Sequence, residues 1–258
     1  MLKELRSKTL IFILIATTLM ILLGHSLLKM FLNNNDPTTS LMVSGTSSLT
    51  FMFTMINAWS VVIAGIFGIS SIRSDFRDKI IYQYLSLPIS RTQYMFSRIL
   101  GTWILVYGYY LYSYLLSALL FSIATHSMVL QWAHLISMLL MGIYVLLVIF
   151  ISFLYSMVAG KISAFLMLIA TVVIISLSTS AFRTLAAVDY LKEISLFKIV
   201  GLIVYFFLPR INYISELASA VMLKEEIKMN IGLESLHLIG TTVLFVFLAD
   251  RVIRRRNF

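Results

Sequence analysis

RSDFRDKIIYQYLSLPISRTQYMFSR, residues 73–98, is the polar stretch around which the rest of the chain is organised. Five apolar side chains in it recur at helical spacing and form one stripe: Phe76, Ile80, Ile81, Tyr84 and Leu85. Polar residues cover the other faces. The spacing therefore predicts a short amphipathic helix over residues 75–87, which Pro88 ends because proline cannot continue a helix.

A second helix is expected directly after this break. Ser90 and Gln93 have the Ser-x-x-Gln spacing of a capping box, in which each side chain bonds to the other residue's backbone N–H. This predicts a helix that begins near Arg91 and continues into the apolar residues beyond Arg98. The organising stretch is thus a helix, a sharp break and another helix.

The composition indicates an integral membrane protein. Of the 258 residues, 60% are hydrophobic and only 12% are charged, and the mean hydropathy is +0.97. The formal net charge of +9 does not indicate nucleic acid, because the basic residues lie at the ends of apolar segments rather than along one polar face. The chain has no cysteine, which excludes disulfides, zinc–thiolate sites, iron–sulfur clusters and thiol nucleophiles.

Six apolar segments are long enough to cross a bilayer, so the sequence predicts an all-α polytopic protein with a single transmembrane domain over residues 1–258. The expected spans are about 9–28, 48–72, 99–124, 134–158, 162–182 and 235–249. The first is read as a retained span rather than a signal peptide, because its apolar run is longer than a typical signal core. Residues 196–208 are apolar but too short to cross upright, which indicates a re-entrant or interfacial helix before the last span.

Small residues recur every four positions in the second expected span, at Ser60, Ala64 and Gly68. Such a ladder allows another helix to approach closely. Packing within the chain is the favoured interpretation, and a seam between two copies is the alternative.

The positions of Lys and Arg predict that both termini are cytoplasmic, because cytoplasmic loops of membrane proteins are enriched in these residues. Thirteen of the twenty lie in the segments expected on that side: Lys3, Arg6, Lys8, Arg73, Arg77, Lys79, Arg91, Arg98, Lys161, Arg251, Arg254, Arg255 and Arg256.

No catalytic, metal or cofactor motif is found in the sequence. The interiors of the expected spans contain no Asp, Glu, Lys or Arg, although ion-coupled transporters usually keep at least one. The histidines lack metal-ligand spacing, and Gly160-Lys161 lacks the other residues of a phosphate-binding loop. The chain is therefore not expected to be an enzyme or to bind a metal or cofactor. If ATP drives it, the nucleotide binds another polypeptide.

The third expected span is rich in tyrosine, a residue that usually lies at membrane interfaces. Tyr107, Tyr110 and Tyr114 share one helical face. They could line a substrate path and contact an amphipathic molecule, or their hydroxyls could bond to neighbouring helices in a packed bundle.

The order of these features resembles the membrane subunit of ABC-2 class ABC transporters. The resemblance consists of Lys3-Glu4 in the leader, two spans, an amphipathic segment with a Leu-Ser-x-Pro-x-Ser-Arg motif, and four more spans. Here the motif is LSLPISR, residues 85–91, and Tyr94 follows it. The chain keeps an acidic Asp75 but has Lys79-Ile80 where the family tends to have Gly-Thr.

The resemblance implies that residues 75–87 form a coupling helix that docks on a separate cytoplasmic ABC ATPase, which binds the ATP. The expected docking residues are Asp75, Phe76, Arg77, Lys79, Ile80, Tyr84, Leu85, Pro88, Ser90 and Arg91. It also implies two ATPase copies, a second permease subunit that is identical or different, and location in a bacterial inner membrane. The alternative for this segment is an interfacial helix in the lipid headgroups.

The expected function is a permease subunit that exports an apolar or amphipathic substrate. One alternative is a membrane scaffold, or a force-transmitting or sensor subunit, that moves no substrate. Another is a lipid-modifying enzyme that uses Glu216, Glu225, Glu226 and His237, for which solvation of a loop is the simpler explanation.

Overall fold

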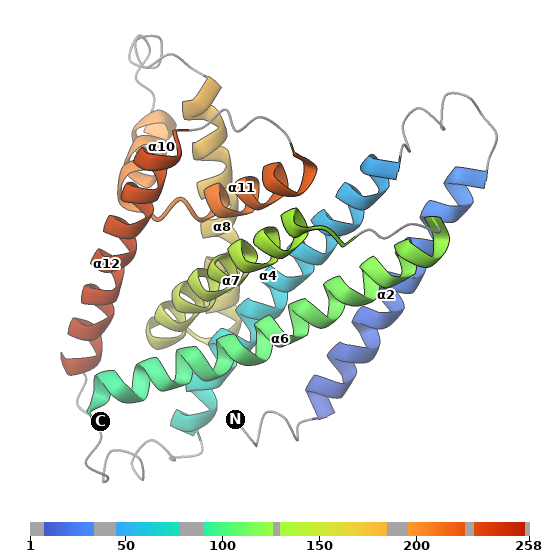
Figure 1. Cartoon of the computed structure of the whole chain (residues 1–258). Helices are drawn as coiled ribbons and strands as arrows, with labels where there is room; N and C mark the ends of the chain where they lie inside the picture. Colours follow the sequence, from blue (N-terminus) through green and yellow to red (C-terminus); the bar gives the residue numbers. More distant parts are fainter. Residues whose placement is uncertain are drawn as a thin grey trace.

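The computed structural model describes residues 8–33, 45–77, 90–125, 130–184, 196–224 and 230–255. Within these ranges the chain is helical and contains no strand (Figure 1). The helices are α2 (Lys8–Asn33), α4 (Gly45–Arg77), α6 (Arg91–Thr125), α7 (Trp132–Val158), α8 (Lys161–Thr184), α10 (Leu196–Phe207), α11 (Ile211–Leu223) and α12 (Ile231–Arg255).

Six of these helices are long and apolar enough to cross a membrane, namely α2, α4, α6, α7, α8 and α12. The prediction of an all-α protein with six candidate spans is therefore confirmed. Each expected span lies within one helix, and each of the six helices is longer than its expected span. The last helix begins four residues before the expected span, which brings Glu234 into its first turn.

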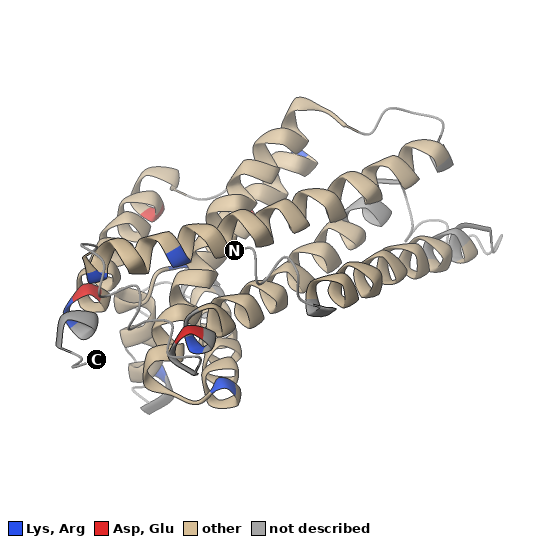
Figure 2. Cartoon of the chain, turned by 90° about the horizontal axis from the view of Figure 1, so that it is seen from below, with Lys and Arg blue, Asp and Glu red and all other residues tan. Residues whose placement is uncertain are grey.

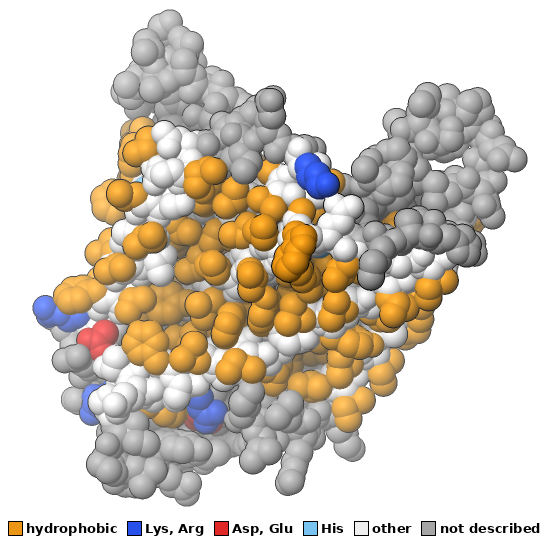
Figure 3. Space-filling view, in the orientation of Figure 1, with side chains coloured by type: hydrophobic (Ala, Val, Ile, Leu, Met, Phe, Trp, Pro, Cys, Tyr) orange, Lys and Arg blue, Asp and Glu red, His pale blue; other side chains and the backbone are white. Residues whose placement is uncertain are grey.

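The six long helices run alternately up and down, so that α2 begins and α12 ends on the same side, at the bottom of Figure 1. The charged residues of the six long helices lie near helix ends, and the helix middles are uncharged (Figure 2). Large apolar side chains, such as Phe12, Leu139 and Leu236, are exposed on the outside and form a broad hydrophobic surface (Figure 3). Such a surface is stable when lipid covers it.

Helix α7 is the centre of the bundle, with α4, α6, α8 and α11 packed around it. Its residues Val145, Val148 and Ile149 have no exposed surface. Because α7 carries apolar residues on nearly every face, it is suited to burial on all sides rather than to one interface.

The small-residue ladder of α4 is buried inside the chain, which confirms the interpretation as packing within one copy. Ser60 and Ala64 are buried, and a Cβ atom at Gly68 would lie 2.8 Å from the Cβ atom of Ser152 on α7. Glycine at this position therefore lets the two helices approach closely.

The expected short apolar helix is present as α10, and a second short helix, α11, follows it. The two form a pair bent by 73° at Pro209 and Arg210, which fits a re-entrant arrangement. The sequence analysis did not predict α11. The inner face of α11 consists of four buried residues at helical spacing: Ile211, Ile214, Ala218 and Met222. Through this face α11 packs across α7 and also contacts α8.

Candidate functional site

The expected coupling segment lies largely outside the described residues, which omit 78–89 and with them Lys79, Ile80, Tyr84, Leu85 and Pro88. Its first three residues, 75–77, continue the helix of the second span, because α4 ends only at Arg77. The side chains of Phe76 and Arg77 are also outside the described part.

The capping box after the break is confirmed. The backbone N–H of Ser90 donates to Oε1 of Gln93 at 3.0 Å, and the backbone N–H of Gln93 donates to Oγ of Ser90 at 3.2 Å. Helix α6 begins at Arg91, as the spacing predicts, and continues without interruption to Thr125.

Asp75, near the end of α4, contacts the first turns of α6. Its carboxylate accepts a hydrogen bond from the Tyr94 hydroxyl and forms an ion pair with Arg98. Only 3% of Asp75 is exposed, and Tyr94 and Arg98 lie one turn apart on α6. The Arg98 guanidinium also lies 5.7 Å from the centroid of the Tyr94 ring, which adds a cation–π contact. The sequence analysis assigned Asp75 to docking and did not pair it with these residues.

Two further contacts join helix ends on the same side of the bundle. Arg73 donates through Nε to the backbone oxygen of Ser156 at 3.3 Å and through Nη2 to that of Ala159. Both oxygens lie at the C-terminus of α7, where a cation is favourable because the helix dipole is negative there. The Thr92 hydroxyl donates to Oδ1 of Asp250 at 2.6 Å and so links α6 to α12.

The three tyrosines proposed for a substrate path lie in the packed core between α6, α7 and α11. The Tyr107 hydroxyl donates to the backbone oxygen of Met138 at 3.3 Å, and the Tyr114 hydroxyl lies 3.8 Å from the sulfur of Met222. Tyr110 is fully buried between their rings, and its hydroxyl has no partner among the described residues. These contacts are those expected for the packing alternative, and none of the three residues lines the two cavities described next.

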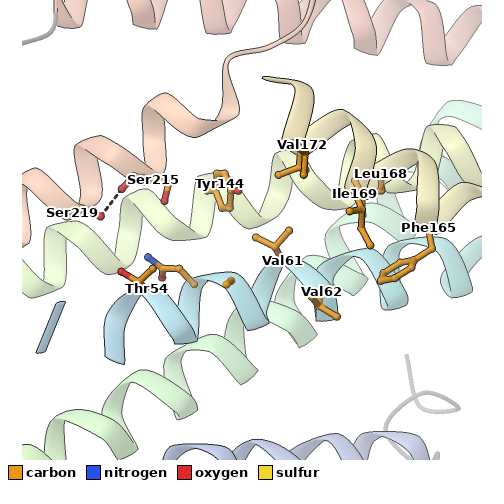
Figure 4. A pocket seen from close by; sticks show the side chains of 13 residues that line it. Thr54, Val61, Val62, Tyr144, Phe165, Leu168, Ile169, Val172, Ser215 and Ser219 are labelled. Carbon is orange, nitrogen blue, oxygen red and sulfur yellow. Dashed lines mark hydrogen bonds between the residues drawn. The ribbon is translucent and has the colours of Figure 1, made fainter. Parts of the chain in front are cut away.

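A cavity of about 440 Å³ lies between α4, α7, α8 and α11 (Figure 4). This volume is in the range of sites for small molecules. Its walls are mostly apolar, with Val61 on α4, Tyr144 on α7 and Leu168 on α8 facing the common space, while α11 contributes Ser215 and Ser219.

Asn57 is the distinctive polar group of this cavity. It lies on α4 among the lining residues, is only 7% exposed, and its side-chain oxygen Oδ1 has no partner in the described part of the chain. A buried amide oxygen without a partner is costly, so a ligand or water that donates to it would be stabilised there. The sequence analysis missed Asn57, although it is the only amide side chain within the second expected span.

A second cavity, of about 760 Å³, lies between α2, α4 and α6. Its lining is apolar apart from hydroxyls that already have partners. Thr18 and Tyr112 bond to each other at 3.0 Å, and the Tyr109 hydroxyl accepts from Nε1 of Trp59 at 3.2 Å. This cavity therefore lacks the polar recognition group that Asn57 provides in the first.

The chain matches the family model described as ABC-2 family transporter protein over residues 1–164. No curated protein and no solved structure matches it. Among the described residues, no group of three or more His, Asp or Glu side chains could hold a metal ion. The family match covers more than half of the 258 residues and includes α2, α4, α6, α7 and the polar stretch 73–98. The chain therefore belongs to the ABC-2 family of transporter proteins, as a membrane-spanning permease.

Proposed function

We propose that this permease is one subunit of an ATP-driven exporter in a bacterial inner membrane, with both termini in the cytoplasm. Two cytoplasmic ABC ATPase subunits bind and hydrolyse the ATP, and a second permease subunit, identical or different, completes the assembly. The segment from Asp75 to residue 87 docks on the ATPase, with its apolar stripe in a groove of the partner.

The contact between Asp75 and α6 is the observation that carries this proposal. The docking segment is continuous with α4 at one end and precedes α6 at the other, and Asp75 joins the two helices through Tyr94 and Arg98. Because the carboxylate is buried and faces α6, we assign it the role of holding the two helices together beside the docking surface. A displacement of the segment would then move α4 and α6 as one body.

In this mechanism ATP closes the ATPase dimer, the docking segments move with it, and the membrane helices change from a closed to an outward-open packing. Helix α4 carries Asn57 and one wall of the 440 Å³ cavity, so its movement would change the shape of that cavity. The apolar walls and the single amide oxygen favour an amphipathic substrate whose hydrogen-bond donor reaches Asn57.

The first experiment is purification of the full chain from membranes in a mild detergent, followed by identification of the proteins that remain bound. The proposal expects a P-loop ATPase, which is lost when Phe76 and Tyr84 are both replaced by Asp, because charged side chains would disrupt the apolar stripe. If no such ATPase is retained, or if this double variant retains it fully, docking through residues 75–87 is wrong.

A second experiment separates docking from coupling. Because the chain has no cysteine, a single Val61→Cys variant reports on the cavity through its rate of labelling with a maleimide, with and without ATP. Asp75→Asn is expected to retain the ATPase and lose the ATP-dependent change, whereas Asp75→Glu, which keeps the carboxylate, should preserve part of it. An unchanged ATP response in Asp75→Asn would refute the coupling role of Asp75. A normal response without any transported molecule would favour the force-transmitting alternative.

A further inference from the structure

The corner between α10 and α11 contains a buried arginine with three contacts. Arg210 donates through Nε to the backbone oxygen of Tyr205 at 3.1 Å, and its guanidinium lies 3.5 Å from the centroid of the Tyr205 ring. Through Nη1 it also forms an ion pair with Oε2 of Glu234 at 2.9 Å. This side chain is therefore fixed in the bend itself.

Glu234 lies in the first turn of α12, so the ion pair connects the re-entrant corner to the last span. Only 10% of the Arg210 side chain and 13% of the Glu234 side chain are exposed. A pair so deeply buried in a membrane protein loses much of its hydration, which makes it a weak source of stability but a strong constraint on geometry. Removal of one partner would leave the other charge buried and uncompensated.

Two more contacts join the same corner to α12. A ring nitrogen of His237, Nε2, lies 2.9 Å from the backbone oxygen of Phe206 at the end of α10. The Tyr213 hydroxyl, near the start of α11, lies 3.3 Å from Oγ of Ser235. The start of α12 therefore holds both sides of the bend.

The held helix, α11, forms one wall of the cavity. Ser215 and Ser219 of α11 form part of the cavity wall opposite α4 and α8 (Figure 4). Because α11 begins at the residue after Arg210, a shift of the corner would move these two residues relative to Asn57 and the apolar walls.

We propose that Arg210 and Glu234 form a clasp that holds α11 in place as one wall of the cavity between α4, α7, α8 and α11. Release of the clasp lets α11 move away from the other walls and widens the cavity on the side opposite the termini. The two residues are positioning residues: they touch no ligand and act through α11. Use of the clasp as the outer gate of an exporter rests on the proposed function, but the position of α11 beside the cavity does not.

The test measures how accessible the cavity wall is. Ser219→Cys is introduced as the single cysteine of the full-length chain, and its labelling by a small maleimide is followed in membrane fragments that expose both faces, without ATP. Glu234→Gln is expected to label at least about tenfold faster, which corresponds to about 1.4 kcal/mol in the opening equilibrium. Glu234→Asp, which keeps the carboxylate, should stay closer to the unmodified rate.

Ser137→Cys is the matched control, because Ser137 is fully buried in α7 and does not line the cavity. The clasp predicts that its labelling stays slow in Glu234→Gln. Equal acceleration at Ser137 and Ser219 would mean general loosening of the fold and would overturn the proposal, as would an unchanged rate at Ser219.

A double-mutant cycle then tests whether the two charges act as one unit. Arg210→Gln combined with Glu234→Gln should accelerate labelling by much less than the product of the two single effects, because each single change already releases the clasp. Independent effects would overturn the pairing. Since these measurements use no ATP, they test the clasp even if the chain proves to work without an ATPase.

Discussion

Replacement of Gly68 by alanine tests the close contact between α4 and α7. The added methyl group would lie 2.8 Å from Cβ of Ser152, 3.2 Å from the backbone oxygen of Ile149 and 3.4 Å from the Ile149 Cα atom. Two of these three atoms belong to the backbone of α7, which cannot rotate away as a side chain can. Helix α7 must therefore shift, and overpacking of this kind costs about 1 to 3 kcal/mol.

Gly108→Ala is the matched control, because a Cβ at Gly108 would meet nothing within 4 Å. Both glycines lie inside long helices, so both substitutions gain about 0.5 to 1 kcal/mol of helix propensity. That gain cancels in the comparison. Gly68→Ala should therefore be about 1 to 3 kcal/mol less stable than Gly108→Ala.

The assay is thermal unfolding of the two purified variants in the same detergent. For chains of 150 to 250 residues, 1 kcal/mol shifts Tm by roughly 2 to 4 °C, so Gly68→Ala should melt about 2 to 12 °C below Gly108→Ala. Equal Tm values, or a lower value for Gly108→Ala, would refute the argument that backbone contact at Gly68 sets the spacing of α4 and α7.

Two further substitutions follow from the polar contacts. Tyr110→Phe removes a buried hydroxyl that has no partner among the described residues. The variant should therefore be more stable by about 1 to 3 kcal/mol in the same melting assay. A lower Tm would show that this hydroxyl is hydrogen-bonded, as a polar substrate path requires. Arg73→Gln removes the hydrogen bonds from the guanidinium to the C-terminus of α7 and should lower the free energy of unfolding by about 1.5 to 3 kcal/mol. The control Lys161→Gln changes an exposed position and should leave Tm unchanged. Equal Tm values for these two variants would contradict the capping role of Arg73.

The six long helices could be predicted from the sequence because hydropathy acts over some twenty consecutive residues. The start of α6 could also be predicted, since Ser90 and Gln93 form a local motif whose two hydrogen bonds need no distant partner. The small-residue ladder indicated a close helix contact, although the spacing alone did not identify α7 as the partner.

Helix α11 was missed for a physical reason. Its 13 residues are too few to cross a membrane, and serine, asparagine and one glutamate interrupt the apolar positions, so a search for long apolar runs does not find it. The stripe Ile211, Ile214, Ala218 and Met222 was present in the sequence and, together with Pro209 just before it, is the signal that indicates a helix.

The contacts of the candidate site and of the α10–α11 bend join residues far apart in the sequence, which no local pattern encodes. Asp75 and Arg98 are far apart in sequence and meet only because α4 and α6 run antiparallel. Arg210 meets Glu234 only because the 73° bend between α10 and α11 lies beside the start of α12. Asn57 stands alone in its span. That it lines a cavity follows only from the packing of α7, α8 and α11 beside α4.

The connection between α7 and α8 consists of only Ala159 and Gly160. Further into the bundle, the hydroxyls of Tyr155 and Thr171 bond across the two helices at 2.6 Å. A connection of two residues keeps the end of α7 next to the start of α8, so the loop itself makes the two helices antiparallel neighbours. These two helices therefore form one antiparallel hairpin, and α11 packs against both of its arms.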